Sequence, residues 1–504
     1  MDTKALRQKI LDLAIRGKLV PQDPNDEPAS VLLEKIRAEK QQMVKDGRLK
    51  AKDIKNDTII FKGEDNLHYE KFQDGSVKCI ENEIPFEVPE GWAWARLGTM
   101  TNIVTGRLDA NAQTPDGEYP FFTCGEEVFK TDSYAFDCNA ILLGGNNATG
   151  DFKMHKFSGK FNAYQRVYVI TTFSEIDMEY LYNHIRYYLP KLQSQSIGSQ
   201  TRYLKLGMIT DLLIAVPTLN EQNQISLLCN KYLNYCTDIF TEKEELLNIV
   251  KLTKSKILDL AIRGLLVPQD PNDEPASVLL ERIRAEKEEL IKQGKIKRDK
   301  KESIIFRGED NSYYEKIGNK SDNIDENIPF EIPVTWNWCR GYTCFAGMES
   351  KKPTDKFFDY IDIDSIDNHN HKIKKTKHLP ASDAPSRASR AVQTGSVLFS
   401  LVRPYLENIA LIEEKSANSI ASTGFYVCNS AGVLYSEYMF FLMISGYVVS
   451  GLNQFMKGDN SPSISKDNIE SWLYPIPPYE EQKVICKKIK SIFSKIEAIE
   501  KSLS

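Results

Sequence analysis

The stretch KILDLAIRGKLVPQDPNDEPASVLLEKIRAEK, residues 9–40, decides the fold because the chain contains it twice. It returns at residues 256–287 with changes only at the positions of Lys18 and Lys35. Repetition of this kind indicates duplicated structural units. Because two near-identical copies must meet near-identical surroundings, the stretch is more typical of a framework or a partner-docking surface than of a substrate pocket.

The repeat continues beyond this stretch in further blocks. One pairs TIIFKGEDNLHYEK (58–71) with SIIFRGEDNSYYEK (303–316), and another pairs DLLIAVPTLNEQNQI (211–225) with SWLYPIPPYEEQKVI (471–485). Between the blocks, after Trp94 and Trp338, the likeness fades. We call the repeated segments frames and the divergent segments between them variable modules. Along the chain the order is frame, variable module, frame, variable module, frame.

Residues 219–263 contain neither Gly nor Pro and predict one long helix. At 1.5 Å per residue such a helix would span roughly 65 Å. Its apolar side chains follow a three-four spacing that is typical of a coiled-coil seam. The predicted seam residues are Ile225, Leu228, Tyr232, Tyr235, Ile239, Leu246, Ile249 and Leu260.

The central helix is a copy of the tail of the chain followed by a copy of its head. Residues 221–244 align with 481–504, and residues 250–263 align with 3–16. We therefore expect the tail and the head to lie together and to form a second strut, antiparallel to the central helix. The alternative is an intermolecular coiled coil in a homodimer.

Each variable module mixes short strand-like runs with one helix near its end, predicted at Glu179–Gln193 and at Glu437–Phe455. The two modules therefore look like one α/β fold with different loops, which implies the same task on two targets. The strand-like runs are YPFFTC (119–124), AILLGG (140–145), QRVYVITT (165–172), YIDID (360–364), GSVLFSLV (395–402) and GFYVCN (424–429).

Composition sets limits on the class of protein. The formal charge of −5 neither supports nor excludes DNA binding. Nine cysteines are scattered without a CxxC pair, which favours reduced thiols and predicts no metal site. The most apolar run, residues 438–452, is too short to cross a bilayer, and the N-terminus lacks the apolar core of a signal peptide. We expect a cytoplasmic protein that has no membrane partner.

Short basic patches and two polar loops in the modules are candidates for DNA contact. The loops are IGSQTRYLKLG (197–207) and KGDNSPSISKD (457–467), which align with each other. Cations neutralise phosphates, whereas Asn, Gln and Arg can reach base edges. The alternative is that the patches are solvated faces and that the loops only return the chain to a strand. The candidate DNA-binding residues are Asn146, Lys153, Lys156, Lys160, Arg166, Gln200, Arg202, Lys205, Lys375, Arg387, Arg390, Arg403, Lys457, Asn460 and Lys466.

Catalytic signatures are absent from the sequence: it contains no GxxxxGK[ST], HExxH, GxSxG or GxGxxG motif. IPPYEEQ comes near the tetrad of amino-methyltransferases, but Ile476 stands where the tetrad needs Asn or Asp. The matching VPTLNEQ lacks the tyrosine, so we interpret both as rigid strand-to-helix connectors. We predict no catalytic residue in this chain.

These features together resemble the specificity subunit of type I restriction-modification systems. The resemblance rests on the repeated ILDLAIRGKLVPQDPNDEPAS block, the two connectors and the alternation of frames with divergent modules, and it covers essentially the whole chain. It implies a non-catalytic subunit in which each module is a target recognition domain for one half of a split DNA site. The helices would space the modules and dock methyltransferase subunits.

The resemblance implies an α+β fold: two α/β target recognition domains separated by long antiparallel coiled-coil helices, in a pseudo-two-fold internal repeat. Its implied partners are double-stranded DNA, two methyltransferase subunits and, through the complex, restriction subunits. It implies no cofactor in this chain, with S-adenosylmethionine, ATP and Mg on the partner subunits. The predicted domains are 1–94 (first helix and frame), 95–217 (first recognition domain), 218–338 (central helix and second frame), 339–477 (second recognition domain) and 478–504 (last helix).

Two other classes of protein stay open at this point. One is a tandem scaffold whose modules bind proteins or peptides, which would lack the steep salt dependence of DNA binding. The other is a self-sufficient enzyme, which the missing motifs disfavour.

Overall fold

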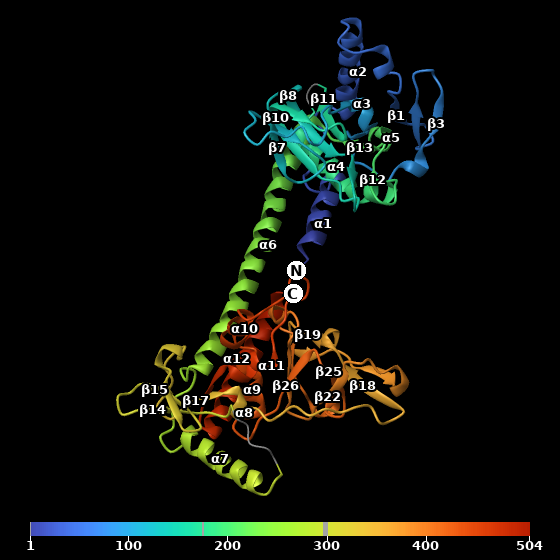
Figure 1. Ribbon diagram of the computed structural model, residues 1–504. Helices are drawn as coiled ribbons and strands as arrows, with labels where there is room; N and C mark the ends of the chain where they lie inside the picture. The colour runs from blue at the N-terminus through green and yellow to red at the C-terminus, as the bar shows by residue number, and fades with distance from the viewer. Residues whose placement is uncertain (1, 174–175, 296–300, 504) are drawn as a thin grey trace. The chain divides into compact units, whose positions relative to one another are not determined.

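The computed structural model describes residues 2–173, 176–295 and 301–503 (Figure 1). The chain forms two compact units, Met1–Lys243 and Glu244–Ser504. Helix α6 (Leu219–Ile262) is continuous and belongs to both units. This confirms the long central helix that the sequence predicts.

The frame of unit 1 consists of two helices and a small antiparallel sheet. Strand β4 then pairs with β13 (Leu213–Val216), so that the beginning and the end of the module are joined. The frame elements are α1 (Thr3–Ile15), α2 (Ala29–Lys45), β1 (Ile59–Lys62), β2 (His68–Lys71), β3 (Val77–Cys79) and β4 (Ala93–Arg96).

The module of unit 1 is built on a six-stranded sheet with the order β5-β11-β8-β10-β6-β7. Strand β10 runs parallel to β6, and the other neighbours in this sheet are antiparallel. Its elements are α3 (Leu97–Met100), β5 (Thr101–Thr105), β6 (Tyr119–Phe122), β7 (Val128–Thr131), β8 (Phe136–Gly144), β9 (Asn146–Asn147), β10 (Met154–Ala163), β11 (Val167–Thr172), α4 (Met178–Gln195), β12 (Arg202–Tyr203), α5 (Leu206–Thr210) and β13 (Leu213–Val216).

Unit 2 repeats the frame and splits its module over more than one sheet. The frame elements after α6 are α7 (Ala276–Lys292), β14 (Ile304–Arg307), β15 (Tyr313–Ile317), β16 (Lys320–Asn323) and β17 (Asn337–Arg340). The module has a four-stranded sheet, β21-β18-β25-β22, and a three-stranded sheet, β24-β23-β26.

The elements of the second module and of the tail are α8 (Gly341–Cys344), β18 (Phe357–Ile361), β19 (Ile366–Asp367), β20 (Lys372–Ile373), β21 (Lys377–Pro380), β22 (Ala388–Ala391), β23 (Val397–Ser400), β24 (Ile409–Leu411), β25 (Ile420–Ser422), β26 (Phe425–Cys428), α9 (Ser436–Met443), α10 (Gly446–Asn453), α11 (Lys466–Ser471), β27 (Leu473–Ile476) and α12 (Tyr479–Leu503). All six strand-like runs picked from the sequence overlap strands of the structure, so those predictions are confirmed.

Each frame is tied to the helix that follows its module by the same hydrogen bond. In unit 1 the indole Nε1 of Trp92 donates to a carboxylate oxygen of Glu221 at 2.7 Å. In unit 2 the Nε1 of Trp336 donates to Glu481 at 3.0 Å. Both carboxylates are buried and lie in the first turn of α6 or α12. The repeated Trp and Glu are therefore structural.

The glutamine that follows each of these glutamates joins the module to the same helix. The side-chain oxygen of Gln222 accepts the backbone N–H of Asp177 at 3.0 Å, just before α4. The side-chain oxygen of Gln482 accepts the backbone N–H of Tyr435 at 2.6 Å, just before α9. The EQ of VPTLNEQ and IPPYEEQ thus braces a strand-to-helix connector, which supports our interpretation of these motifs.

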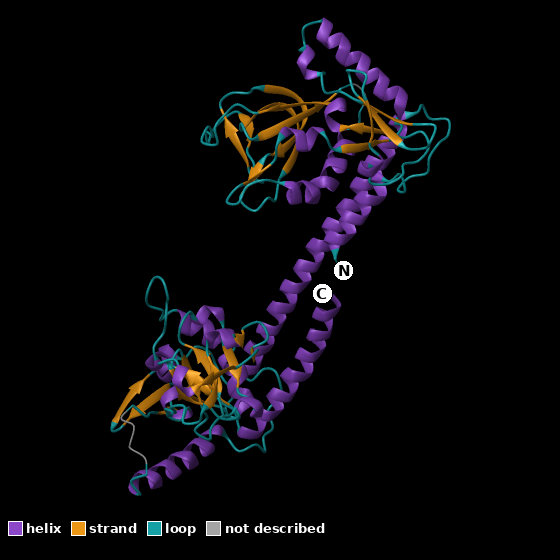
Figure 2. Ribbon diagram, turned by 90° about the vertical axis from the view of Figure 1, so that its right-hand side faces the viewer, coloured by secondary structure: helices purple, strands orange, loops and turns teal. Residues whose placement is uncertain are grey.

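A terminal helix packs against α6 within each unit (Figures 1 and 2). In unit 1, α1 shares a hydrophobic cluster with the first half of α6, and Arg7 bonds to Thr237 at 2.7 Å. In unit 2, α12 shares a cluster with the second half, and Lys254 pairs with Glu500 at 2.7 Å. Both terminal helices run antiparallel to α6.

The buried stripe of α6 differs from the predicted seam. Of the eight seam residues only Ile225 is buried, and five of them, Tyr232, Tyr235, Ile239, Leu246 and Ile249, are exposed. In unit 1 the helix instead buries a stripe next to the predicted one. This stripe consists of Ile225, Cys229, Leu233 and Cys236. Free cysteines behave as small hydrophobic side chains, which shifts the apolar face away from the one that we predicted.

The helix predicted at Glu437–Phe455 is two helices, so that prediction was wrong in its continuity. The chain turns at Ser445, whose hydroxyl accepts the N–H of Val448 and so caps α10. Serine and glycine at this point favour a helix start over a helix interior. The most apolar run of the sequence is thus divided between α9 and α10. Over the residues that the structure describes, no helix has the length and apolar character needed to cross a bilayer.

Candidate nucleic-acid interface

In unit 1 two candidate segments lie side by side next to the C-terminal end of strand β8. Strand β9 pairs antiparallel with β12, which places Asn147 opposite Arg202. The loop after α4 closes on itself through reciprocal backbone hydrogen bonds between Ile197 and Tyr203. A further backbone bond joins Leu204 N to Gly145 O at 2.8 Å. We call residues 145–150 and 197–205 the first paired loops.

Unit 2 contains the same arrangement. Lys457 and Ser463 exchange two backbone hydrogen bonds of 3.0 Å, and Ser463 also bridges to Val402. The N–H of Ile464 donates to the carbonyl of Leu401 at 2.9 Å, just as Leu204 does to Gly145 in unit 1. We call residues 401–407 and 457–463 the second paired loops.

A glycine allows the turn of the second segment in both units. Gly198 has φ +109°, and a Cβ added there would lie 2.1 Å from the carbonyl oxygen of Thr201. Gly458 has φ +98°. Side chains other than glycine rarely adopt such φ values. The glycines that the sequence aligns in the two loops therefore serve the same backbone turn.

The side chains on this shared backbone differ between the units. Arg202 lies on the second segment in unit 1, where the aligned residue of unit 2 is Pro462. In unit 2 the arginine is on the first segment instead: Arg403 has φ +47° and its backbone N–H donates to Pro462 O at 2.7 Å. Its guanidinium also donates to the carbonyl of Asn460 at 3.0 Å.

Three of the predicted cations of the first module already have internal partners. Lys153 pairs with Asp151 at 2.8 Å, Lys156 with Glu179, and the ammonium of Lys160 lies 4.6 Å from the ring centroid of Tyr134. The partner carboxylates reduce the charge that Lys153 and Lys156 can offer to phosphate. Lys153 and Lys156 are therefore weaker candidates than the sequence alone indicates.

The other predicted residues of the first module lie on or next to the paired loops. Gln200 and Lys205 belong to them and are exposed, and Arg166 accepts the N–H of Gly145 through its carbonyl at 2.7 Å. Within the described residues no side-chain hydrogen bond or ion pair is formed by any member of this group. Its members are Asn146, Arg166, Gln200, Arg202 and Lys205.

In unit 2 the structure brings Arg403, Lys457 and Asn460 together and leaves other candidates elsewhere. Lys466 lies in α11 and pairs with Glu470 at 3.1 Å. Arg390 lies on β22 in the other sheet of the module.

Two other candidates of unit 2 flank the four-stranded sheet. Arg387 precedes β22, and its carbonyl accepts the backbone N–H of Thr423 at 2.8 Å. The carbonyl of the next residue, Gly424, accepts the N–H of Leu401 in the second paired loops at 2.8 Å. Lys375 is exposed between β20 and β21.

Sequence reasoning missed the apolar side chains that flank the paired loops. Tyr203 is 40% exposed in unit 1, and Tyr405 and Leu406 are 46% and 40% exposed in unit 2. Exposed aromatic side chains beside cations are typical of surfaces that contact nucleic acid. The Arg202–Tyr203 dipeptide was the available signal, but our prediction for this loop rested on its polar and basic residues alone.

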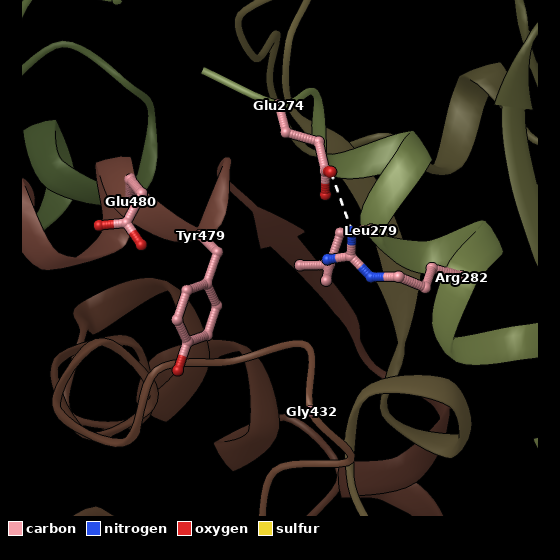
Figure 3. Close-up of a pocket in the computed structure, with 6 residues that line it drawn as sticks. All are labelled: Glu274, Leu279, Arg282, Gly432, Tyr479 and Glu480. Carbon is pink, nitrogen blue, oxygen red and sulfur yellow. Dashed lines mark hydrogen bonds and ion pairs between the residues drawn. The ribbon is translucent and has the colours of Figure 1, made fainter. Parts of the chain in front are cut away.

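A shallow pocket in unit 2 contains the tyrosine of IPPYEEQ (Figure 3). Arg282 there pairs with Glu274 at 3.0 Å. The ring of Tyr479 lies 4.9 Å from the ammonium of Lys483 and 6.3 Å from the ring of Tyr435. Tyr479 therefore stabilises the start of α12, in agreement with a structural role. The other lining residues are Leu279, Gly432 and Glu480.

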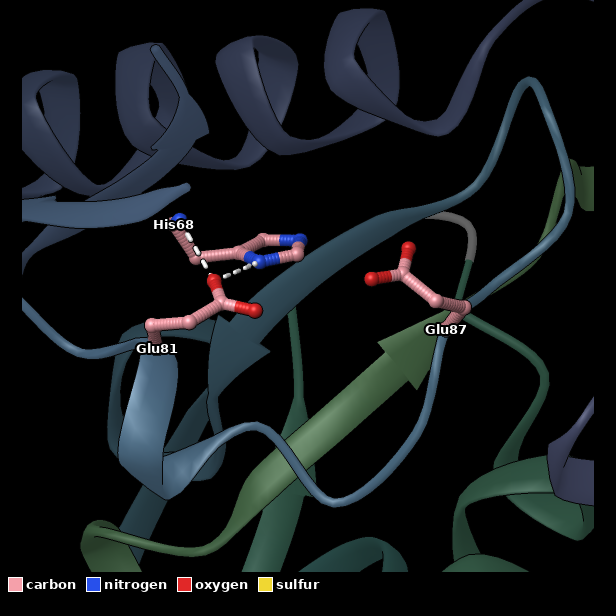
Figure 4. A group of neighbouring side chains, drawn as sticks. All are labelled: His68, Glu81 and Glu87. Atoms are coloured by element: carbon pink, nitrogen blue, oxygen red, sulfur yellow. Dashed lines mark hydrogen bonds and ion pairs between the residues drawn. The ribbon is translucent and has the colours of Figure 1, made fainter. Parts of the chain in front are cut away.

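His68, Glu81 and Glu87 form a side-chain cluster in the first frame (Figure 4). One carboxylate oxygen of Glu81 contacts both the backbone N–H and the Nδ1 of His68 at 2.8 Å. These hydrogen bonds lower the pKa of Glu81. In the second frame Asp325 accepts the backbone N–H of Tyr313 in the same way. The carboxylate therefore fixes the backbone of the strand in both frames. The histidine is present in the first frame only, and Tyr313 takes its place in the second.

Comparison with known proteins finds similar sequences over most of the chain. Residues 89–248, which include the first paired loops, match the family described as type I restriction modification DNA specificity domain. The type I restriction enzyme EcoDI specificity subunit of Escherichia coli is 28% identical over 423 residues, which cover 83% of this chain and 85% of the relative. The chain is an HsdS-like protein.

Further relatives have the same kind of name. The EcoEI specificity subunit of Escherichia coli is 26% identical to the HsdS-like chain over 570 residues, with 97% of this chain and 89% of the relative covered. Among solved structures, the HsdS subunit from Thermoanaerobacter tengcongensis is 32% identical with a TM-score of 0.32, and the match covers 34% of this chain and 45% of that chain.

Proposed function

We propose that this chain is the DNA sequence-specificity subunit of a type I restriction-modification complex. Each module would read one half of a bipartite DNA site, and the chain itself would carry out no catalysis. The family match and the named relatives support this role. We keep the domain boundaries predicted from the sequence, with the recognition domains at 95–217 and 339–477.

One observation carries the proposal of two half-sites. The two units repeat the backbone hydrogen bonds of the paired loops, but they place different side chains on them. A common scaffold with different polar side chains is suited to the same kind of contact with two different base sequences. Two copies of one binding specificity would not need this divergence.

The helices would act as a spacer and as a docking surface. α6 would hold the two modules apart, and we propose that the tail and the head of the chain complete a second, antiparallel strut. The antiparallel packing of α1 and α12 on the two halves of α6 supports this. The half-sites should then be separated by about one turn of B-DNA, about 34 to 36 Å. The near-identical frames would recruit two copies of the methyltransferase subunit.

The remaining parts of the activity would come from partner subunits. Methyltransferase subunits would bring S-adenosylmethionine, and restriction subunits would bring ATP and Mg. The complex would act on double-stranded DNA in the cytoplasm.

Coexpression of the chain with its methyltransferase subunit, followed by sequencing of methylated bases, tests the proposal. We expect one split, asymmetric adenine motif, and no methylation from the isolated chain. An assembled complex that writes no motif contradicts the proposed function. Binding of the complex to duplex DNA should also weaken steeply with added salt through counterion release; a protein-binding scaffold would show no such dependence.

A further inference from the structure

The paired loops meet the requirements for direct reading of base edges better than the partnered lysines Lys153, Lys156 and Lys160 of the first module. Sequence is read by side chains that contact base edges in the grooves. A side chain that is held by an internal partner is less available for such a contact. In the first module the side chains of Asn146, Gln200 and Arg202 have no such partner within the described residues. They come from two segments that β9 and β12 hold in fixed register.

The guanidinium of Arg202 is aligned by the backbone around it. A Cβ added at Gly150 would lie 3.0 Å from Cδ of Arg202, so the side chain runs along the turn at Gly150. Its Nε is buried and has no hydrogen-bond partner in the described part of the chain. A buried, unsatisfied N–H is costly in the free protein, which favours a ligand that supplies an acceptor.

The turn at Gly150 has its own internal hydrogen bonds. The side-chain oxygen of Asn147 accepts both the N–H and the hydroxyl of Thr149 at 2.8 Å. Asn147 is therefore occupied in the turn, whereas its neighbour Asn146 is not. Asn147 is therefore a structural residue, and Asn146 is a candidate for contact with a base.

We propose that the paired loops are the base-reading edges of both modules, an inference that rests on the proposed function. In unit 1 the specificity-determining residues are Asn146, Gln200 and Arg202. In unit 2 Lys457 and Asn460 take this role. Arginine recognises guanine through two hydrogen bonds, and asparagine or glutamine recognises adenine in the same manner.

Arg403 is a positioning residue in this scheme. It adopts a left-handed backbone conformation, with φ +47°, and its guanidinium donates to the carbonyl of Asn460 at 3.0 Å. The arginine thereby fixes the tip of the second segment from the first segment. Arg202 of unit 1 would therefore contact a base itself, whereas Arg403 of unit 2 would hold Asn460 in position to contact a base.

The test uses the full chain in its complex with the methyltransferase subunit and reads the methylated motif. Arg202→Gln should relax one position of one half-site, with a loss of discrimination of roughly 5- to 150-fold, and should leave the other half-site intact. Lys153→Gln is the matched control, because Lys153 pairs with Asp151 in the same module. The control should leave the motif unchanged.

Arg403→Met and Arg403→Lys test the positioning role. Arg403→Met should relax the half-site of unit 2, whereas Arg403→Lys, which keeps one donor for the carbonyl of Asn460, should retain most of the discrimination. Melting temperatures of the assembled complexes show whether each variant is folded. Relaxation of both half-sites by either residue overturns the assignment of the loops to separate modules.

The outcomes separate this inference from the proposed function. If the wild-type complex writes a split motif and the variants Arg202→Gln, Asn146→Ala and Gln200→Ala all leave it unchanged, the paired loops do not read bases although the function stands. If the assembled wild-type complex writes no motif, both proposals fail. A change at one position of one half-site supports both.

Discussion

The two frames of this chain share side-chain contacts, whereas the two modules share only backbone hydrogen bonds in their paired loops. In the two frames corresponding side chains make corresponding contacts, as Trp92 with Glu221 and Trp336 with Glu481 illustrate. In the two modules the paired loops share backbone hydrogen bonds, but their side chains differ. A frame that repeats its side-chain contacts suits two copies of one partner, whereas a repeated scaffold with new side chains suits two different ligands.

The frames are not identical in every contact. Lys40 and Asp57 form an ion pair in which the side chains are 3% and 8% exposed, whereas Lys287 and its partner Glu302 are 23% and 21% exposed. Burial lowers the pKa of Lys40 and raises that of Asp57, although each partner opposes the shift in the other. The first frame thus contains a buried pair that the second frame keeps near solvent.

The largest effect is expected from the repeated tryptophans. Trp92→Ala and Trp336→Ala should each reduce the free energy of unfolding of their own unit by about 3–5 kcal/mol, because each leaves a cavity and removes a hydrogen bond to a buried carboxylate. Denaturant unfolding measures this. A large loss in one unit and none in the other would show that the two frames are not equivalent.

Lys40→Met should destabilise the first frame more than the corresponding variant Lys287→Met destabilises the second. It leaves Asp57 buried without its partner and should reduce stability by about 3–5 kcal/mol. Lys287→Met should cost less, because Glu302 can be hydrated. The double variant Lys40→Met, Asp57→Leu is the control and should recover most of the loss. Equal losses for Lys40→Met and Lys287→Met would contradict the difference in burial.

The stability of both frames should depend on pH in the same way. Burial raises the pKa of Glu70 and Glu315, but hydrogen bonds from Arg96 and Arg340 outweigh it, so both pKa values lie below their usual range. Their stabilisation is present above the unfolded pKa, about 4.3, and is lost as the pH falls through the lower folded value.

Glu70→Gln and Glu315→Gln should therefore reduce stability by about 1–3 kcal/mol at pH 7. Thermal unfolding at a series of pH values should show the deficit of each variant shrinking below about pH 4. A deficit that does not change with pH would assign the loss to packing instead of charge.

The smallest effect concerns cations within the first module. Arg166→Gln and Lys205→Gln should each lower the slope of DNA affinity against salt by about 0.9, if each contacts one phosphate. Lys153→Gln and Lys156→Gln should change it less, because Asp151 and Glu179 already pair with these lysines. Affinity titrations at several salt concentrations measure the slopes. Equal slopes for all four variants would remove the distinction between partnered and unpartnered cations.

Much of this organisation could be predicted from the sequence. The repeated blocks gave the frames, and the absence of Gly and Pro gave α6. The buried stripe of α6 was missed because Cys229 and Cys236 were not counted as apolar. The break at Ser445 was missed because the apolar run was treated as one helix, although Ser445 and Gly446 lie within it. Internal partners such as Glu179 for Lys156 could not be found, since the pair depends on how β10 and α4 meet in space.

Exchange of residues 95–217 for the recognition domain of another family member tests the central claim most directly. The complex is coexpressed with its methyltransferase subunit, and the methylated motif is sequenced. We predict that one half of the motif changes while the other half and the spacing between them are kept. A change in both halves, or in neither, would contradict a chain in which two separate modules read two half-sites.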